Sequence, residues 1–259
     1  MRSTGISLSV GAPALSWASA VWHCSGSRSG AMGYSRTIAP LVWLTGEALA
    51  GAMSGLGMGI AAQPIADVNI EDVVLSASRL AMEEDDYRVL GVLVTWLDAH
   101  HARLNADRVI RVVSALDGER TRTFWAAMAV RWADDRRWVR LAQGWKGRRI
   151  DLLRVGSAFQ LKRHGEDPRF AAGPLVVPLG VLRERTADVL APAVLAERHA
   201  AYRLRVQMGP VYRADAWAVL EREPWISISE LARRSYLSFA TAWQVKHDHE
   251  IVHGQRDMR

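Results

Sequence analysis

The chain has very little cysteine, since Cys24 is the only one among 259 residues. A single cysteine excludes an intrachain disulfide and a zinc cluster built from several thiolates. A reducing compartment suits such a chain, so we predict a cytoplasmic location. Catalytic signatures are also scarce, because the sequence contains no P-loop, no G-x-S-x-G elbow and no paired Cys–His arrangement. We therefore predict that the protein is not an enzyme and that it uses no cofactor.

Charged residues are rare in the first 62 residues, which carry only Arg2, Arg28, Arg36 and Glu47. Gly, Ser and Ala dominate this segment, so we predict a disordered or low-complexity extension over residues 1–62, of which residues 1–52 are dispensable for folding. The apolar stretch from Ile38 to Ala62 raises the alternative of a membrane anchor. Its central glutamate and its five glycines argue against a transmembrane helix, and its late position argues against a signal peptide. We predict no membrane partner.

The composition as a whole is that of a globular protein, with 49% hydrophobic and 23% charged residues. The net charge of +6 and the pI of about 10.0 favour acidic partners such as nucleic acid. The charge is unevenly spread: residues 63–102 hold eight acidic and two basic side chains, and residues 103–163 hold fifteen basic and six acidic ones.

The densest basic run covers residues 136–163, where Asp151 is the only acidic residue. Such a run is typical of a surface that contacts phosphate. We predict DNA-phosphate contacts from Arg136, Arg137, Arg140, Lys146, Arg148 and Arg149. The alternative is that the run neutralises the acidic residues 83–86, either within the fold or in a homodimer.

Apolar periodicity predicts a mainly α-helical protein. One helix follows Asn69 as its N-cap, a second covers 87–97 and ends near His100 and His101, a third follows Asn105, and a fourth covers 124–132. His100 and His101 are expected to face the negative end of the helix dipole. Trp96, Trp125, Trp132 and Trp138 fall on or beside the apolar stripes and are predicted to be core residues.

Residues 138–141 and 148–153 are predicted to form a small basic β hairpin around Gly144 and Gly147. Three helices followed by a hairpin is the order of a winged helix, so we predict a helical, winged-helix-like domain over 63–155; a helical bundle is the alternative. An irregular connecting region is expected over 156–200. It contains a candidate buried strand at 175–179 and a helix over 188–199 interrupted by Pro192.

The last predicted domain covers 201–259 and contains three closely spaced helices between residues 214 and 247. The first ends at Pro224, the second is expected to be capped by Ser229, and the third by Ser238. The residues predicted to face inward are Ala216, Val219, Leu220, Leu231, Ala232, Leu237, Ala242 and Val245. Tyr236 stands where such turns usually carry glycine, so we predict either an unfavourable backbone conformation there or a longer turn.

The pattern Glu230-Leu-Ala-Arg-Arg followed by Ala240-Thr-Ala-Trp resembles the helix-turn-helix and winged-helix DNA-binding regulators at superfamily level, over residues 214–254. The resemblance implies that the third helix enters the major groove. Tyr236 departs from the family pattern, and too few residues follow Gly254 for a full wing. We predict a DNA-binding transcriptional regulator, and by analogy an autoregulating or antitoxin-like role.

The predicted DNA contacts of this unit are Ser238, Phe239, Thr241, Trp243, Gln244, His247, Arg233 and Arg234. Gln244 suits an adenine edge, and Phe239 suits a thymine methyl group. Phe239 and Trp243 also form an aromatic i,i+4 pair, which is typical of a protein-binding helix. A protein–protein interaction adaptor is therefore the first alternative, and a purely structural three-helix unit is the second.

His249-Glu250-Ile-Val-His253 matches the H-E-x-x-H zinc motif and resembles that of the zinc metallopeptidases. On a helix both imidazoles would share one face, and Glu250 would activate a metal-bound water. Lys246 and Asp248 place charges where that helix is normally apolar, no third ligand follows, and an upstream ligand such as His164 or His199 would be needed. We predict a solvated tail and no metal, with a zinc-dependent hydrolase as the remaining alternative.

Overall fold

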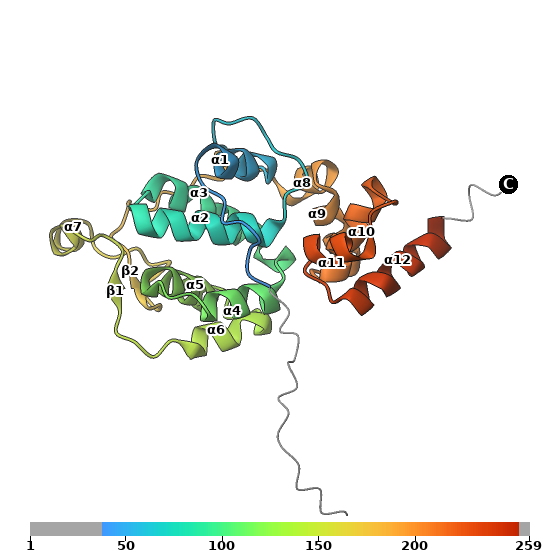
Figure 1. The fold of residues 1–259 in the computed structure, drawn as a ribbon. Coiled ribbons are helices and arrows are strands. Elements are labelled where there is room, and N and C mark those ends of the chain that lie inside the picture. The colour runs from blue at the N-terminus through green and yellow to red at the C-terminus, as the bar shows by residue number, and fades with distance from the viewer. Residues whose placement is uncertain (1–37, 254–259) are drawn as a thin grey trace, which may run out of the picture. The chain divides into compact units, whose positions relative to one another are not determined.

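The structure is a computed structural model that describes residues 38–253, and these residues belong to one compact unit (Figure 1). It is mainly α-helical, as the apolar periodicity predicts. The described helices are α1 (Gly46–Gly55), α2 (Ile70–Glu84), α3 (Tyr87–His100), α4 (Ala106–Ser114), α5 (Glu119–Arg131), α6 (Val139–Gly144), α7 (Ser157–His164), α8 (Pro192–Arg198), α9 (Ala200–Met208), α10 (Tyr212–Arg222), α11 (Ile228–Arg234) and α12 (Phe239–His253). Short 3-10 turns η1 (His101–Arg103), η2 (Arg136–Trp138) and η3 (Thr186–Asp188) and the strands β1 (Ile150–Asp151) and β2 (Leu175–Val176) complete the described elements.

Two helix starts follow directly from asparagine side chains. The Asn69 side-chain oxygen accepts a hydrogen bond from the Asp72 N–H, and the Asn105 oxygen accepts one from the Arg108 N–H. Each cap satisfies a backbone donor that the helix itself leaves unpaired, and such caps are worth about 1 kcal/mol. The predicted helices after Asn69 and Asn105 are confirmed as α2 and α4, and those over 87–97 and 124–132 are confirmed within α3 and α5.

The largest core forms around α2, which packs against α1, α3 and α5. Trp96, Trp125 and Trp138 are fully buried and Trp132 nearly so, which confirms the prediction that they are core residues. The indole N–H of Trp96 donates to the Leu56 carbonyl at 2.8 Å, and that of Trp125 donates to the Ser78 hydroxyl at 2.9 Å. These two bonds satisfy the buried indole N–H groups of Trp96 and Trp125, which gives both rings structural roles.

The described part of the predicted N-terminal extension is not an extension. Helix α1 buries Leu49, Ala52 and Met53 in the large core. Its glycines reflect close packing, since a Cβ on Gly55 would lie 1.9 Å from the Ile65 carbonyl oxygen. Residues 1–37 lie outside the described residues, so the rest of that prediction is untested. Across residues 38–253, no helix has both the length and the hydropathy needed to cross a membrane.

The predicted β hairpin is wrong. Residues 139–144 form helix α6, and strand β1 pairs in parallel with β2, with Ile150 opposite Leu175 and Asp151 opposite Val176. Trp138 and Leu141 are both buried, and their spacing of three residues suits a helix better than a strand. The candidate buried strand at 175–179 is confirmed at its first two residues, as β2. Pro192 begins α8 instead of interrupting a helix, because its missing N–H is not needed in the first turn.

His100 does not act as the predicted dipole cap. Its ring is fully buried, with Nε2 donating to the Leu190 carbonyl at 3.0 Å and Nδ1 accepting from the Tyr202 hydroxyl at 2.8 Å. The carbonyl can only accept, so it fixes the neutral tautomer with the proton on Nε2. Burial lowers the pKa of His100 to about 4. The histidine therefore joins α3 to the segments before and after α8 as a neutral group.

Candidate functional site

The last three helices form a second, smaller core in which α10 packs on α11 and α12. The hydroxyl of Ser227 accepts from the Glu230 N–H and caps α11, two residues earlier than the predicted Ser229. The hydroxyl of Ser238 accepts from the Thr241 N–H at 3.1 Å, at the predicted start of α12. Residues 235–238 join the two helices.

The residues predicted to face inward in these helices do so. All eight are buried: Ala216, Val219, Leu220, Leu231, Ala232, Leu237, Ala242 and Val245. Small side chains at positions 232 and 242 allow α11 and α12 to approach closely. Burial of this side of α12 also determines which of its residues face solvent.

Tyr236 has a φ of 56°, in the left-handed region, which confirms the unfavourable backbone predicted at this position. That conformation costs a non-glycine residue roughly 1–2 kcal/mol. The buried side chain offsets this cost: its hydroxyl donates to Asp72 at 2.6 Å and accepts from the Leu41 N–H at 3.2 Å. The Arg108 guanidinium lies 3.5 Å from the ring centroid. Burial, with Asp72 nearby, raises the pKa of Tyr236. The turn before α12 is thus fixed to α2 and α4.

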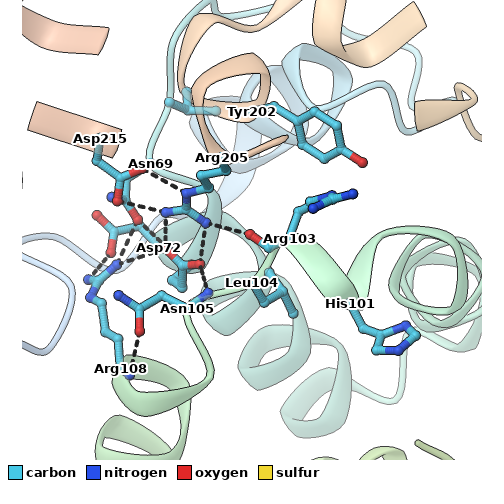
Figure 2. Close-up of polar contacts among 12 residues, drawn as sticks. Asn69, Asp72, His101, Arg103, Leu104, Asn105, Arg108, Tyr202, Arg205 and Asp215 are labelled. Atoms are coloured by element: carbon cyan, nitrogen blue, oxygen red, sulfur yellow. Dashed lines mark hydrogen bonds and ion pairs between the residues drawn. The ribbon is translucent and has the colours of Figure 1, made fainter. Parts of the chain in front are cut away.

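A buried charge network holds α9 and α10 to α2 (Figure 2). The Arg205 guanidinium, with no exposed surface, donates to both oxygens of Glu71 at 2.6 and 2.7 Å and to both oxygens of Asp215 at 2.7 Å. It also donates to the Arg103 carbonyl at 3.0 Å. Buried charges are costly when they lack a partner, so removal of Arg205 would leave the buried Asp215 carboxylate without its ion pair.

The carboxylates of this network respond differently to burial. Burial raises the pKa of Asp215. Burial also acts to raise the pKa of Glu71, but Arg205 and Arg108 more than compensate, and that pKa lies below its usual value. This network was not predicted, because an acidic residue such as Glu71 in the first turn of a helix is already explained by its interaction with the helix dipole. Its partner Arg205 lies 134 residues away.

The solvent-facing side of α12 carries an aromatic and apolar row at intervals of four residues. Phe239 is 58% exposed, Trp243 50% and Ile251 58%. Between them, the His247 ring stacks on Trp243 with 5.4 Å between centroids. Thr241 and Gln244 are also exposed. The prediction that this face of the helix is outward is confirmed.

The cations near this face are paired with carboxylates. Arg233 donates to Glu230 at 2.5 and 2.7 Å, and Arg234 donates to Glu223 at 2.8 and 2.9 Å. The hydrogen bonds from Arg233 hold the pKa of Glu230 below its usual value. The Gln244 amide donates to Asp248 at 2.8 Å. Exposed pairs of this kind contribute at most about 1 kcal/mol, so an incoming phosphate can replace them at small cost.

The structure separates the six basic residues predicted between 136 and 149. Arg137 is bound to Asp135 and Arg149 to Glu166, and Arg140 lies 3.6 Å from Asp107. The remaining three are exposed and have no ion pair within the described residues: Arg136, Lys146 and Arg148. Helix α6 packs on α5 and η2, whereas α12 packs on α10 and α11. The two predicted sets of DNA contacts are therefore held by different parts of the fold.

The alternative for the basic run, that it neutralises the acidic residues 83–86, holds for one side chain. Arg154 pairs with Asp85 at 2.8 Å and donates to the Glu83 carbonyl. Arg120, from α5, also pairs with Asp85 at 2.9 Å. This acidic run is thus partly neutralised within the fold.

The H-E-x-x-H residues lie on α12; the predicted solvated state is wrong for His249, which is buried, whereas His253 is exposed at the end of the helix. Their ring centroids are 4.4 Å apart, and His249 is buried with its centroid 5.1 Å from that of Trp217. Burial lowers the pKa of His249. His199 is already engaged, with Nε2 donating to the Val68 carbonyl. Within residues 38–253, no three His, Cys, Asp or Glu side chains are grouped to hold a metal ion.

No protein-family model, curated protein or solved structure matches the chain. The function must therefore be inferred from the geometry of the described residues.

Proposed function

We propose that α10–α12 form a helix-turn-helix unit and that the protein binds DNA as a transcriptional regulator. The observation that supports this best is the connection at 235–238, where left-handed Tyr236 follows α11 and Ser238 caps α12. A short turn of this kind sets the angle between two helices packed through small residues such as Ala232. In regulators of this type the second of the two helices lies in the major groove.

The first half of α12 supplies the side chains for reading bases. Gln244 is exposed and can offer its amide to the N6 and N7 edge of an adenine once it releases Asp248. Phe239, 58% exposed, suits the methyl group of a thymine. Arg233 and Arg234, at the end of α11, are placed to exchange their carboxylate partners for phosphates. An autoregulating or antitoxin-like role would suit such a regulator, by analogy alone.

The experiment that tests this proposal is selection of binding sites from a random duplex library with the full-length protein. Gln244→Ala should weaken binding to the selected site by about 1–3 kcal/mol and leave binding to random duplex nearly unchanged. Gln207→Ala is the matched control, because Gln207 is an exposed glutamine on α9. The proposal fails if no sequence is enriched, or if the two variants lose the same affinity.

A second candidate function is protein docking through the same face of α12. The observation that favours it is the exposed row of Phe239, Trp243 and Ile251, since such a stripe is typical of helix-mediated interfaces. The simplest partner is a second copy of the chain, which would pack the two rows against each other. Sedimentation equilibrium should then show a dimer that Trp243→Ala dissociates. A monomer at all concentrations contradicts this second candidate.

A further inference from the structure

A cavity of about 340 Å³ lies between α4, α5, α6 and the loop that follows α6. Its lining includes three cations, Arg122, Arg140 and Lys146, together with Glu119 and Trp145. This volume is within the range of about 300–1,000 Å³ that small-molecule and cofactor sites occupy. The cavity lies outside the α12 face, so it is separate from the DNA contacts proposed for α11 and α12.

The cations of this cavity are largely uncompensated. Arg122 and Lys146 are exposed and have no ion-pair partner within the described part of the chain. Arg140 is 73% exposed and lies 3.6 Å from Asp107, a carboxylate that Arg111 holds more closely, at 3.2 Å. Glu119 is the one acidic residue in the lining. Three cations facing one carboxylate favour an anionic ligand, and phosphate is the anion that arginine and lysine commonly bind.

Trp145 gives the cavity an aromatic wall. It is half-buried, in contrast to the fully buried Trp96, Trp125 and Trp138 of the large core. The indole lies beside Gly147 and Lys146 in the lining, since a Cβ built on Gly147 would be in ordinary van der Waals contact with its Nε1, at 3.4 Å. An indole next to cations is the combination that binds a base and its phosphate.

We propose that this cavity binds a nucleotide, with the base stacked on Trp145 and the phosphate held by Arg122, Arg140 and Lys146. The Glu119 carboxylate is placed in the same lining to accept hydrogen bonds from a ribose hydroxyl or an exocyclic amine. The nucleotide can be a free nucleoside phosphate or one unit of a single strand. Both sources present the same chemistry to these residues, and the experiment distinguishes them.

The test is calorimetric titration of the full-length protein at low salt with AMP, adenosine, inorganic phosphate and a deoxyadenosine pentanucleotide. AMP or the pentanucleotide should bind more tightly than adenosine or phosphate alone. Tight AMP binding identifies a free nucleotide as the source, and binding of the pentanucleotide alone identifies a strand. Failure of both to bind overturns the proposal, as does an affinity for phosphate equal to that for AMP.

Variants with matched controls locate the site. Lys146→Ala should weaken nucleotide binding by roughly tenfold, whereas Lys162→Ala, which removes an exposed lysine on α7, should not. Trp145→Ala should weaken it by roughly tenfold, and Trp145→Phe should retain most of the affinity. Trp225→Ala is the aromatic control, since Trp225 is 78% exposed and does not line the cavity. Equal losses in the variants and their controls contradict the proposal, whatever the outcome for duplex DNA.

Discussion

Tyr236 fixes the turn before α12, so Tyr236→Phe should destabilise the fold without changing its shape. The variant keeps the ring under the Arg108 guanidinium and keeps the backbone conformation. It removes the 2.6 Å bond to Asp72 and the 3.2 Å bond from the Leu41 N–H. A hydrogen bond to a charged group contributes about 1.5–3 kcal/mol. Asp72 still accepts from Arg108, and water can reach the exposed Leu41, so we expect a loss of about 2–3 kcal/mol in total.

Urea unfolding, followed by far-ultraviolet circular dichroism, measures this loss as the change in the free energy of unfolding. Tyr87→Phe is the matched control, because the Tyr87 hydroxyl lies near the Asp85 carboxylate and its bond to the Leu152 carbonyl is 3.4 Å long. That bond is long and weak, so the control should lose less than about 1 kcal/mol. If Tyr236→Phe loses no more than the control, Tyr236 does not attach the turn to α2 and the reasoning fails.

Three further predictions concern other parts of the fold. Because burial lowers the pKa of His100 to about 4, folding keeps the imidazole neutral while the unfolded chain takes up a proton below about pH 6.5. The free energy of unfolding should therefore decrease as the pH is lowered from about 6.5 to 4, by roughly 2 kcal/mol between pH 7.5 and pH 5. Urea unfolding should show a smaller decrease for His100→Gln. In the same assay, Met53→Ala should lower the free energy of unfolding by about 2–5 kcal/mol, because Met53 is buried. The control Met208→Ala should lower it little, because Met208 is 38% exposed. Equal losses would place α1 outside the core. Glu230→Gln frees Arg233 and should strengthen binding to random duplex by up to about fivefold in anisotropy titrations, and an unchanged affinity would remove Arg233 from the DNA contacts.

Local signals in the sequence predicted most of the helices. Asn69 and Asn105 cap α2 and α4 with their own side chains, so the residue that starts each helix is visible in the sequence. The left-handed backbone at Tyr236 was one of two predicted outcomes, because this residue stands where such turns usually carry glycine. The outward face of α12 followed from the predicted inward positions.

The errors arose where long-range packing decides the structure. Glycine-rich α1 has the composition of a flexible segment, yet its glycines allow Gln63 and Ile65 to approach the helix. Residues 138–141 form too short an apolar run for periodicity to distinguish strand from helix. The pairing of β1 with β2 joins segments separated by a helix, and no local turn signal announces it.

The charges of the candidate site show the same limit. The sequence shows where the cations between 136 and 149 lie along the chain. It does not show their carboxylate partners, which come from other segments. Arg149 pairs with Glu166, and Arg140 approaches Asp107. Three cations of the run have no ion pair within the described residues: Arg136, Lys146 and Arg148. Only the folded arrangement gathers Lys146 with Arg122 and Trp145 around one cavity.

The most direct test of the central proposal is the salt dependence of DNA binding by the full-length protein. Fluorescence anisotropy with a labelled random-sequence duplex gives the slope of log K against log salt concentration. If Arg233 and Arg234 both exchange their carboxylates for phosphates, the slope should be about −1.8 or more negative, since each contact contributes about −0.9. Absence of binding at low ionic strength, or binding with a slope near zero, would contradict the assignment of α12 as a DNA-binding helix.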